Sequence, residues 1–176
     1  MIHEYRMAGA LEHNRHMARF AYVLPLLFYC CGCFGQSLTI TGVGIETVVL
    51  SAKDLAAMEH ISAAYFDAGK TTTYRGVAVE SILKKAGVLM NQPHGGKPLH
   101  MCILAMASDG YRVVYALAEF DSAIRKQQPI VADESEGKPL GEKVGPLRLV
   151  MPDEKKGARS VRMLEKLELV DLTAGK

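Results

Sequence analysis

The sequence contains no tryptophan, few aromatic residues and almost no excess of charge of either sign. Without tryptophan, the indole faces that often line carbohydrate or choline sites are missing. A net charge of +2 over 176 residues is too balanced for a protein that binds nucleic acid. A Walker phosphate loop, a dinucleotide fingerprint and a nucleophile elbow are also absent from the sequence. These absences argue against several large functional classes and leave one domain of ordinary size.

Cysteine is scarce outside the N-terminal region. Cys30, Cys31 and Cys33 lie in an apolar run, whereas Cys102 is the sole cysteine after residue 35. One thiol cannot form a disulfide within the domain, so a disulfide framework is excluded there. Cys102 falls in a run predicted to be a core strand, where a free cysteine behaves as a small hydrophobic residue. A redox thiol or a metal ligand is the alternative.

The N-terminal region has the pattern of a secretory signal. Residues 20–35 carry no charged side chain, follow Arg15 and Arg19, and end in Gly35. A basic region, a short apolar region and a small-residue cleavage site are typical of such signals. The apolar run is also shorter than the roughly 20 residues that span a bilayer, and a proline interrupts it.

We therefore predict that residues 1–35 are an N-terminal extension and signal peptide, cleaved near Gly35. Residues 36–176 then form a single periplasmic or secreted domain without membrane attachment. Met17 is a more typical signal start than Met1, which indicates an over-extended start. An uncleaved anchor, a buried helix and a lipoprotein are the alternatives.

Strand patterns dominate the body of the chain. Alternating or continuous apolar runs predict strands over residues 38–42, 46–50, 60–66, 71–74, 101–106, 113–117, 127–132, 147–151 and 161–170. The spacing predicts helices over 52–58, 79–86 and 117–124, the first capped by Ser51 and Asp54 and the second with Glu80 facing outward. Residues 133–138 are predicted to be a polar turn. The fold class is therefore α+β, mostly β with mixed sheets and two or three short helices.

Residues 107–112 predict the central hairpin of the domain. Asp-Gly between two apolar runs is a strong hairpin signal, because both residues tolerate a positive φ. The turn brings Asp109, Tyr111 and Arg112 together at one end of a sheet, where a rigid scaffold can present polar groups.

Five short motifs occur in order between about residue 38 and residue 170. They are Tyr74–Val79 with the following Leu83 and Ala86–Val88, then Asp109–Tyr111, Gly137–Leu140, Gly145–Pro152 and Ser160–Arg162. Together they resemble the sulfite-oxidase-type molybdopterin-binding domain. The resemblance implies the mixed, mostly β fold of that family, with molybdopterin as its cofactor and arginines lining the pterin-phosphate and substrate pocket.

One feature of the family pattern is missing. Catalytic members hold molybdenum with a cysteine thiolate from the strand before the Tyr74–Val79 motif. Here that region, residues 60–71, contains no cysteine. A thiolate is the soft ligand that such a metal would take, so we predict no metal ligands and no bound cofactor. Molybdopterin enters only through the family resemblance.

Arginines offer an anion site. Between residues 143 and 166, seven basic residues stand against three acidic ones. Arginine recognises phosphate and carboxylate with two parallel hydrogen bonds. The candidate ligand-binding residues are Arg75, Asp109, Tyr111, Arg112, Arg148 and Arg159, and the alternative is a solvated basic face. Arg148 interrupts an apolar strand and requires a buried partner, such as Asp109 or Asp133.

Histidines give no metal signature. His60, His94 and His100 are isolated in sequence and are predicted to have structural or surface roles. The sequence thus predicts an exported domain that binds a small anionic ligand or a partner protein without molybdenum chemistry. The alternative is a molybdopterin-dependent oxidoreductase, or a subunit of a periplasmic redox complex.

Overall fold

A computed structural model describes residues 36–67, 69–90 and 98–173. The segment predicted to be a signal peptide lies outside these residues. Among the helices that are described, none is long and apolar enough to cross a membrane.

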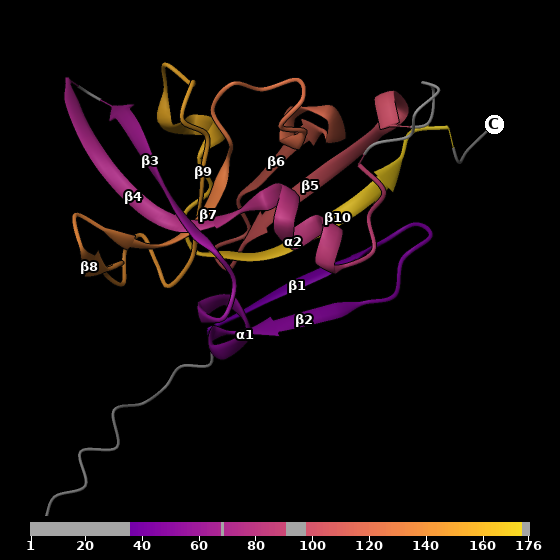
Figure 1. The fold of residues 1–176 in the computed structure, drawn as a ribbon, viewed down its shortest axis with the longest axis horizontal. Helices are drawn as coiled ribbons and strands as arrows, with labels where there is room; N and C mark the ends of the chain where they lie inside the picture. Colours follow the sequence, from indigo (N-terminus) through magenta and orange to yellow (C-terminus); the bar gives the residue numbers. More distant parts are fainter. Residues whose placement is uncertain (1–35, 68, 91–97, 174–176) are drawn as a thin grey trace, which may run out of the picture. The chain divides into compact units, whose positions relative to one another are not determined.

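The first sheet has five strands in the order β2-β1-β10-β5-β6 (Figure 1). β1 and β10 pair in parallel, and the other neighbours are antiparallel, so the sheet is mixed. The strands are β1 (Ser37–Gly42), β2 (Val48–Ser51), β5 (Met101–Ala107), β6 (Arg112–Ala116) and β10 (Leu164–Asp171). The strands predicted over residues 38–42 and 46–50 correspond to β1 and β2, which pair as an antiparallel hairpin.

The second sheet follows the order β3-β4-β7-β8, and β9 pairs with β7 off this path. Its strands are β3 (His60–Asp67), β4 (Lys70–Ala78), β7 (Ile130–Ser135), β8 (Lys138–Pro139) and β9 (Arg148–Val150). The β3–β4 hairpin projects from the body at the upper left of Figure 1.

The prediction of a long polar turn over residues 133–138 is wrong. β7 continues to Ser135, and only Glu136 and Gly137 form the turn into β8. Both have positive φ, 51° and 72°, as the tightest hairpin turns require. Asp133, Glu134 and Ser135 are therefore half-buried residues of a paired strand rather than of a loop, which composition alone does not distinguish.

Two short α-helices join the sheets: α1 (Ala52–Ala56) and α2 (Val79–Lys85). The predicted cap of α1 is confirmed, because the Ser51 and Asp54 side chains each bond the other's backbone N–H. Three 3₁₀ turns complete the fold: η1 (Pro98–His100), η2 (Leu117–Phe120) and η3 (Gly157–Arg159). The predicted helix over 117–124 is therefore shorter than expected.

Glu80 does not face outward as predicted. It is only 5% exposed, because the chain around Ser122 covers this side of α2. Its carboxylate accepts from the Ser122 backbone N–H at 3.3 Å and lies 2.7 Å from Lys84 Nζ. Glu80 and Lys84 thus form an ion pair one turn apart on α2.

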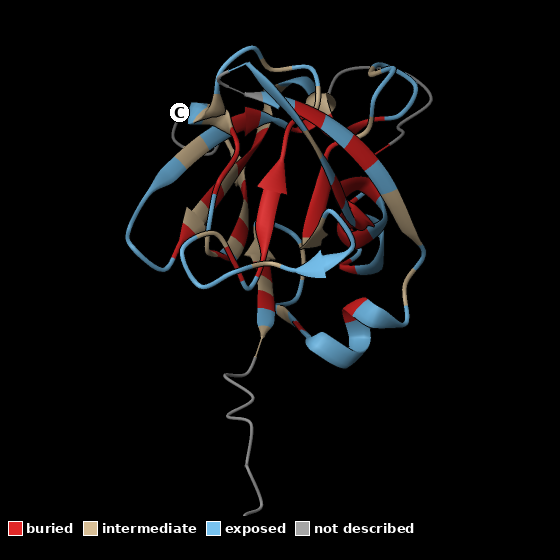
Figure 2. Cartoon of the chain, turned by 90° about the vertical axis from the view of Figure 1, so that its left-hand side faces the viewer, coloured by how far each residue is buried: buried red, intermediate tan, exposed pale blue. Residues whose placement is uncertain are grey.

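Residues of both sheets and of α2 build the larger of two hydrophobic clusters; the smaller one, which includes Tyr65 and Tyr74, lies on the second sheet. The buried members of the larger cluster include Leu38, Ile40, Val77, Ile82, Leu83, Ile103, Ala105, Val131, Leu149, Leu167 and Leu169. Figure 2 shows buried residues concentrated along the strands, whereas α1 exposes every residue except Leu55. The α+β class with mostly β, mixed sheets is confirmed.

The hairpin around Asp109 is present, but it is not central. β6 is the edge strand of the first sheet, and β5 pairs on its other side with β10. The hairpin signal is local, whereas β10 reaches β5 from about sixty residues further along the chain. A turn motif therefore predicts the pairing of its own two strands but not their position in a sheet.

Gly76, in the first family-like motif, has a steric role. A Cβ at this position would lie 2.1 Å from the Val131 carbonyl oxygen, where β4 and β7 shift register. Only glycine permits the backbones to approach this closely.

His60 ties the start of β3 to β7. Its Nδ1 lies 2.9 Å from the Met58 carbonyl oxygen, and its Nε2 lies 3.1 Å from Asp133 Oδ2. Both partners are acceptors, so only the imidazolium, with a proton on each nitrogen, satisfies both. Burial lowers the pKa of His60, but the hydrogen bonds to Asp133 and Met58 and the charge of Asp133 raise it by more than burial lowers it. The net effect is a pKa above the ordinary value of histidine.

We predict that His60→Gln destabilises the fold more in acid than in base. Because the folded pKa is raised, the stabilisation is complete below the unfolded pKa of about 6.5 and is lost as the pH rises through the folded pKa. Near pH 5 the loss should be about 2 kcal/mol, the worth of a charged hydrogen bond. Urea unfolding of both proteins near pH 5 and pH 9 measures the difference; an equal cost at both pH values would contradict the ion pair.

Candidate functional site

The β5–β6 turn is fastened to the η3 segment. Asp109 Oδ1 accepts from the Tyr111 backbone N–H at 2.9 Å, and Gly110 takes a φ of 86°, which fixes the turn. The Tyr111 hydroxyl donates to the Ala158 carbonyl oxygen at 2.6 Å. Below it, the Tyr115 hydroxyl donates to the Arg159 carbonyl oxygen. Burial raises the pKa of Tyr115, so its phenol remains a neutral donor.

An open hollow of about 230 Å³ lies beside these contacts. We call it the hairpin-tip hollow; it is lined by Asp109, Tyr111, Gly157, Ser160 and Arg162. Ser160 is buried, and its hydroxyl oxygen accepts from the Met151 backbone N–H at 3.2 Å, which anchors that wall. Arg162 is exposed and makes no ion pair with any described residue.

Arg159 lies behind the hollow and is already neutralised. Its guanidinium lies 2.7 Å from a Glu119 oxygen and 3.1 Å from a Glu154 oxygen. Its central carbon is 4.9 Å from the Tyr115 ring centroid. Two carboxylates and an aromatic face thus compensate this charge, so Arg159 holds the η3 segment rather than offering a free cation.

The structure splits the predicted set of ligand-binding residues. Asp109 and Tyr111 line the hollow, and Arg112 begins β6 beside them, exposed and opposite Met106. Arg75 is on β4 of the other sheet, 3.3 Å from Glu134. The six residues therefore do not form one site.

Arg148 is buried in the second sheet, and the predicted aspartate partner is wrong. Its guanidinium donates to the Tyr74 hydroxyl and lies 5.3 Å and 4.9 Å from the ring centroids of Tyr65 and Tyr74. Asp133 bonds His60 instead, and Asp109 belongs to the hairpin turn. The faces of the two tyrosine rings, rather than a carboxylate, therefore stabilise the positive charge of Arg148.

Comparison with known proteins shows which family this fold belongs to. The model of the oxidoreductase molybdopterin-binding domain family matches residues 65–175. The chain belongs to this family. Among solved structures, the sulfane dehydrogenase SoxCD from Paracoccus pantotrophus is similar, with a TM-score of 0.60 and 18% sequence identity. The match covers 77% of this chain and 38% of that chain, so this protein spans well under half of its length. No curated protein sequence matches the chain.

The described residues do not fit the thiolate-held molybdenum of catalytic family members. β3 contains no cysteine, and the one described thiol, Cys102, is on β5 and only 6% exposed. Burial raises the pKa of Cys102, which favours the thiol over the thiolate that binds metals. Nor do three or more histidine, cysteine or carboxylate side chains gather in the described parts of the chain. His94 lies outside those parts.

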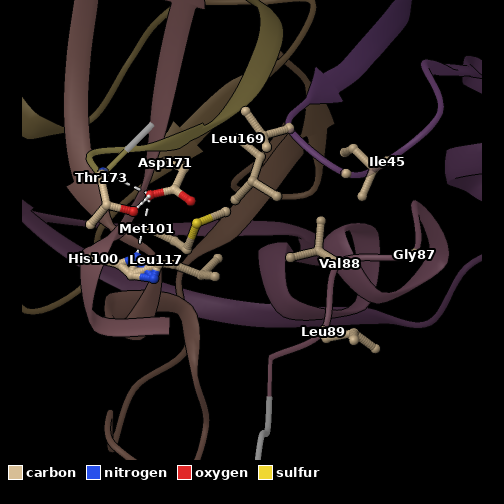
Figure 3. Close-up of a pocket in the computed structure, with 12 residues that line it drawn as sticks. Ile45, Gly87, Val88, Leu89, His100, Met101, Leu117, Leu169, Asp171 and Thr173 are labelled. Atoms are coloured by element: carbon tan, nitrogen blue, oxygen red, sulfur yellow. Dashed lines mark hydrogen bonds and ion pairs between the residues drawn. The ribbon is translucent and has the colours of Figure 1, made fainter. Parts of the chain in front are cut away.

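A second, larger pocket of about 570 Å³ lies where β5 begins and β10 ends, at the other end of these strands from the hairpin-tip hollow (Figure 3). We call it the strand-end pocket. Figure 3 shows a polar group, His100 with Asp171 and Thr173, at one side and apolar side chains such as Ile45 and Val88 at the other.

The sequence does not predict which residues meet in the hairpin-tip hollow or in the strand-end pocket. Ser160 and Arg162 belong to a quoted motif, but nothing in the sequence places them beside Asp109, some fifty residues away. His100 and Asp171 are separated by 71 positions. Their meeting depends on the pairing of β5 with β10, and no local pattern reports such a pairing.

Two tyrosine variants test the surroundings of Arg148. Tyr74→Phe keeps the ring but removes the acceptor of a buried cation, so we expect a loss of about 1–3 kcal/mol in stability. Tyr65→Phe is the matched control, because the buried Tyr65 hydroxyl has no partner among the described residues. It should leave stability unchanged or raise it. Equal costs in urea unfolding would show that the Arg148–Tyr74 hydrogen bond is not what stabilises the cation.

Proposed function

We propose that this protein is an exported ligand-binding member of the molybdopterin-binding oxidoreductase family, which binds a small anion without thiolate-held molybdenum. The hairpin-tip hollow is the anion site of this proposal. Support for export comes from the charge and apolar pattern of residues 15–35.

The observation that carries the proposal is Arg162, the basic residue in the lining of the hollow. Residues 155–162 hold Lys155, Lys156, Arg159 and Arg162 and no acidic residue. Arg159 forms ion pairs with Glu119 and Glu154, whereas Arg162 lines the hollow without a carboxylate partner among the described residues. A guanidinium in that position can donate two hydrogen bonds to one oxyanion.

The size of the hollow limits the ligand. At about 230 Å³ it is smaller than the roughly 300–1,000 Å³ of sites for whole drug-sized molecules. It suits a phosphate, a sulfate or the anionic end of a longer molecule. Asp109 is the opposing charge: its carboxylate lines the same hollow and weakens anion binding.

Family membership favours one alternative, a molybdopterin-dependent oxidoreductase or a subunit of a redox complex. The similar SoxCD structure is a dehydrogenase. In this alternative the metal ligand comes from a partner subunit or from residues that the structure does not describe.

We predict that Arg162→Gln weakens sulfate binding about tenfold, the equivalent of about 1.4 kcal/mol. NMR titration with sodium sulfate against sodium chloride at constant ionic strength measures the affinity. Arg75→Gln is the matched control, because it removes the same charge from the other sheet and should leave the affinity unchanged.

Asp109→Asn should change the affinity for sulfate in the opposite direction to Arg162→Gln. It removes the negative charge of the hollow but keeps an oxygen that accepts from the Tyr111 N–H. An anion site should then bind sulfate more tightly. Weaker binding by this variant, or equal binding by Arg162→Gln and the parent protein, would refute the anion site.

Metal analysis separates the two functions. Protein purified from a host that makes molybdopterin should contain neither stoichiometric molybdenum nor the fluorescence of oxidised pterin. Stoichiometric molybdenum with pterin would establish the oxidoreductase alternative instead. Cys102→Ser adds a check, because unchanged metal content excludes the single described thiol as a ligand.

A further inference from the structure

The strand-end pocket is separate from the anion site. The two share no lining residue, and they lie at opposite ends of β5, which has seven residues. At a rise of about 3.3 Å per residue, about 20 Å separates them. A ligand of the strand-end pocket therefore does not occupy the hairpin-tip hollow.

The walls of this pocket are mostly apolar. Val88, Leu117 and Leu169 are buried core residues that close its floor, and Leu89 and Val43 line it while remaining 70% and 51% exposed. Exposed side chains of this kind bury apolar surface when a ligand enters. The volume of about 570 Å³ is within the range of small-molecule sites.

One side of the pocket carries three hydrogen-bonded residues, His100, Asp171 and Thr173. His100 Nδ1 lies 3.3 Å from Asp171 Oδ1, which also accepts from Thr173 N at 2.8 Å and Thr173 Oγ1 at 2.7 Å (Figure 3). The two Thr173 bonds lower the pKa of Asp171, so it is an ionised acceptor.

The acceptor fixes the tautomer of the neutral histidine. Because a carboxylate only accepts, the ring proton is on Nδ1, and Nε2 carries a lone pair. Nε2 makes no hydrogen bond to any described residue. The pocket thus combines an apolar wall with two neighbouring acceptors, His100 Nε2 and the second oxygen, Oδ2, of the negatively charged Asp171 carboxylate.

We propose that the strand-end pocket binds a compact, uncharged, mostly apolar molecule with a single hydroxyl group, of the phenol class, whose O–H donates to His100 Nε2. An anion would meet the lone pair of Nε2 and the charge of Asp171. A purely apolar molecule would leave Nε2 without a partner.

Three probes of one shape test this proposal on the parent protein at about pH 8. They are p-cresol, toluene and p-toluate, and NMR titration of the amide signals reports both affinity and location. We expect p-cresol to bind about 3- to 10-fold more tightly than toluene, as one net hydrogen bond predicts. The toluate anion should bind more weakly than p-cresol.

Variants assign the contacts. His100→Phe keeps an aromatic ring without the acceptor, so p-cresol should lose its preference over toluene. Leu89→Asp should weaken the binding of both p-cresol and toluene. Val49→Asp, the same apolar-to-acidic change at an exposed position on β2 outside the pocket, should leave the binding of both unchanged. Melting temperatures of the variants show that each is folded.

Several outcomes would overturn the proposal. They are no binding of p-cresol up to its solubility limit, equal binding of p-cresol and toluene, tighter binding of toluate, or a preference that survives in His100→Phe. Because Arg162→Gln is expected to leave p-cresol binding unchanged, failure here and failure of the anion site are distinguishable.

Discussion

The pairing of β10 between β1 and β5 is the constraint on which the rest of the structure depends. β10 runs parallel to β1 and antiparallel to β5, and it carries Leu167 and Leu169 into the core. It joins the start of the domain to its end. Such long-range pairing costs chain entropy, which the burial of apolar side chains must repay.

The same strand also positions both candidate sites. The segment before β10 supplies Ser160 and Arg162 to the hairpin-tip hollow, and the end of β10 supplies Asp171 to the strand-end pocket. β5 runs beside it and ends in the turn that carries Asp109, while its other end follows His100. Each site is therefore built where the same two neighbouring strands stop.

Charges inside the fold are compensated in three different ways. Glu119 and Glu154 neutralise Arg159, aromatic rings and a hydroxyl surround Arg148, and Asp133 pairs with His60, whose pKa it raises. Burying a charge without such partners would be costly. Two of the four arginines that the sequence suggested for ligand binding, Arg148 and Arg159, are held in these ways, and a third, Arg75, pairs with Glu134 on the other sheet. The arginine that lines the hollow is Arg162.

Local chemistry is what the sequence determined by itself. Most of the strands, the two α-helices, the Ser51 cap and the Asp109-Gly110 turn rest on neighbouring residues, and the structure contains them. The exceptions are the helix predicted over 117–124, which is a 3₁₀ turn, and the polar turn predicted over 133–138, which is mostly strand. Only the tertiary structure decided the edge position of β6, the burial of Glu80, the partner of Arg148 and the meeting of His100 with Asp171. Each of these joins residues about forty or more positions apart, and their proximity follows from how the sheets pack rather than from any pattern along the chain.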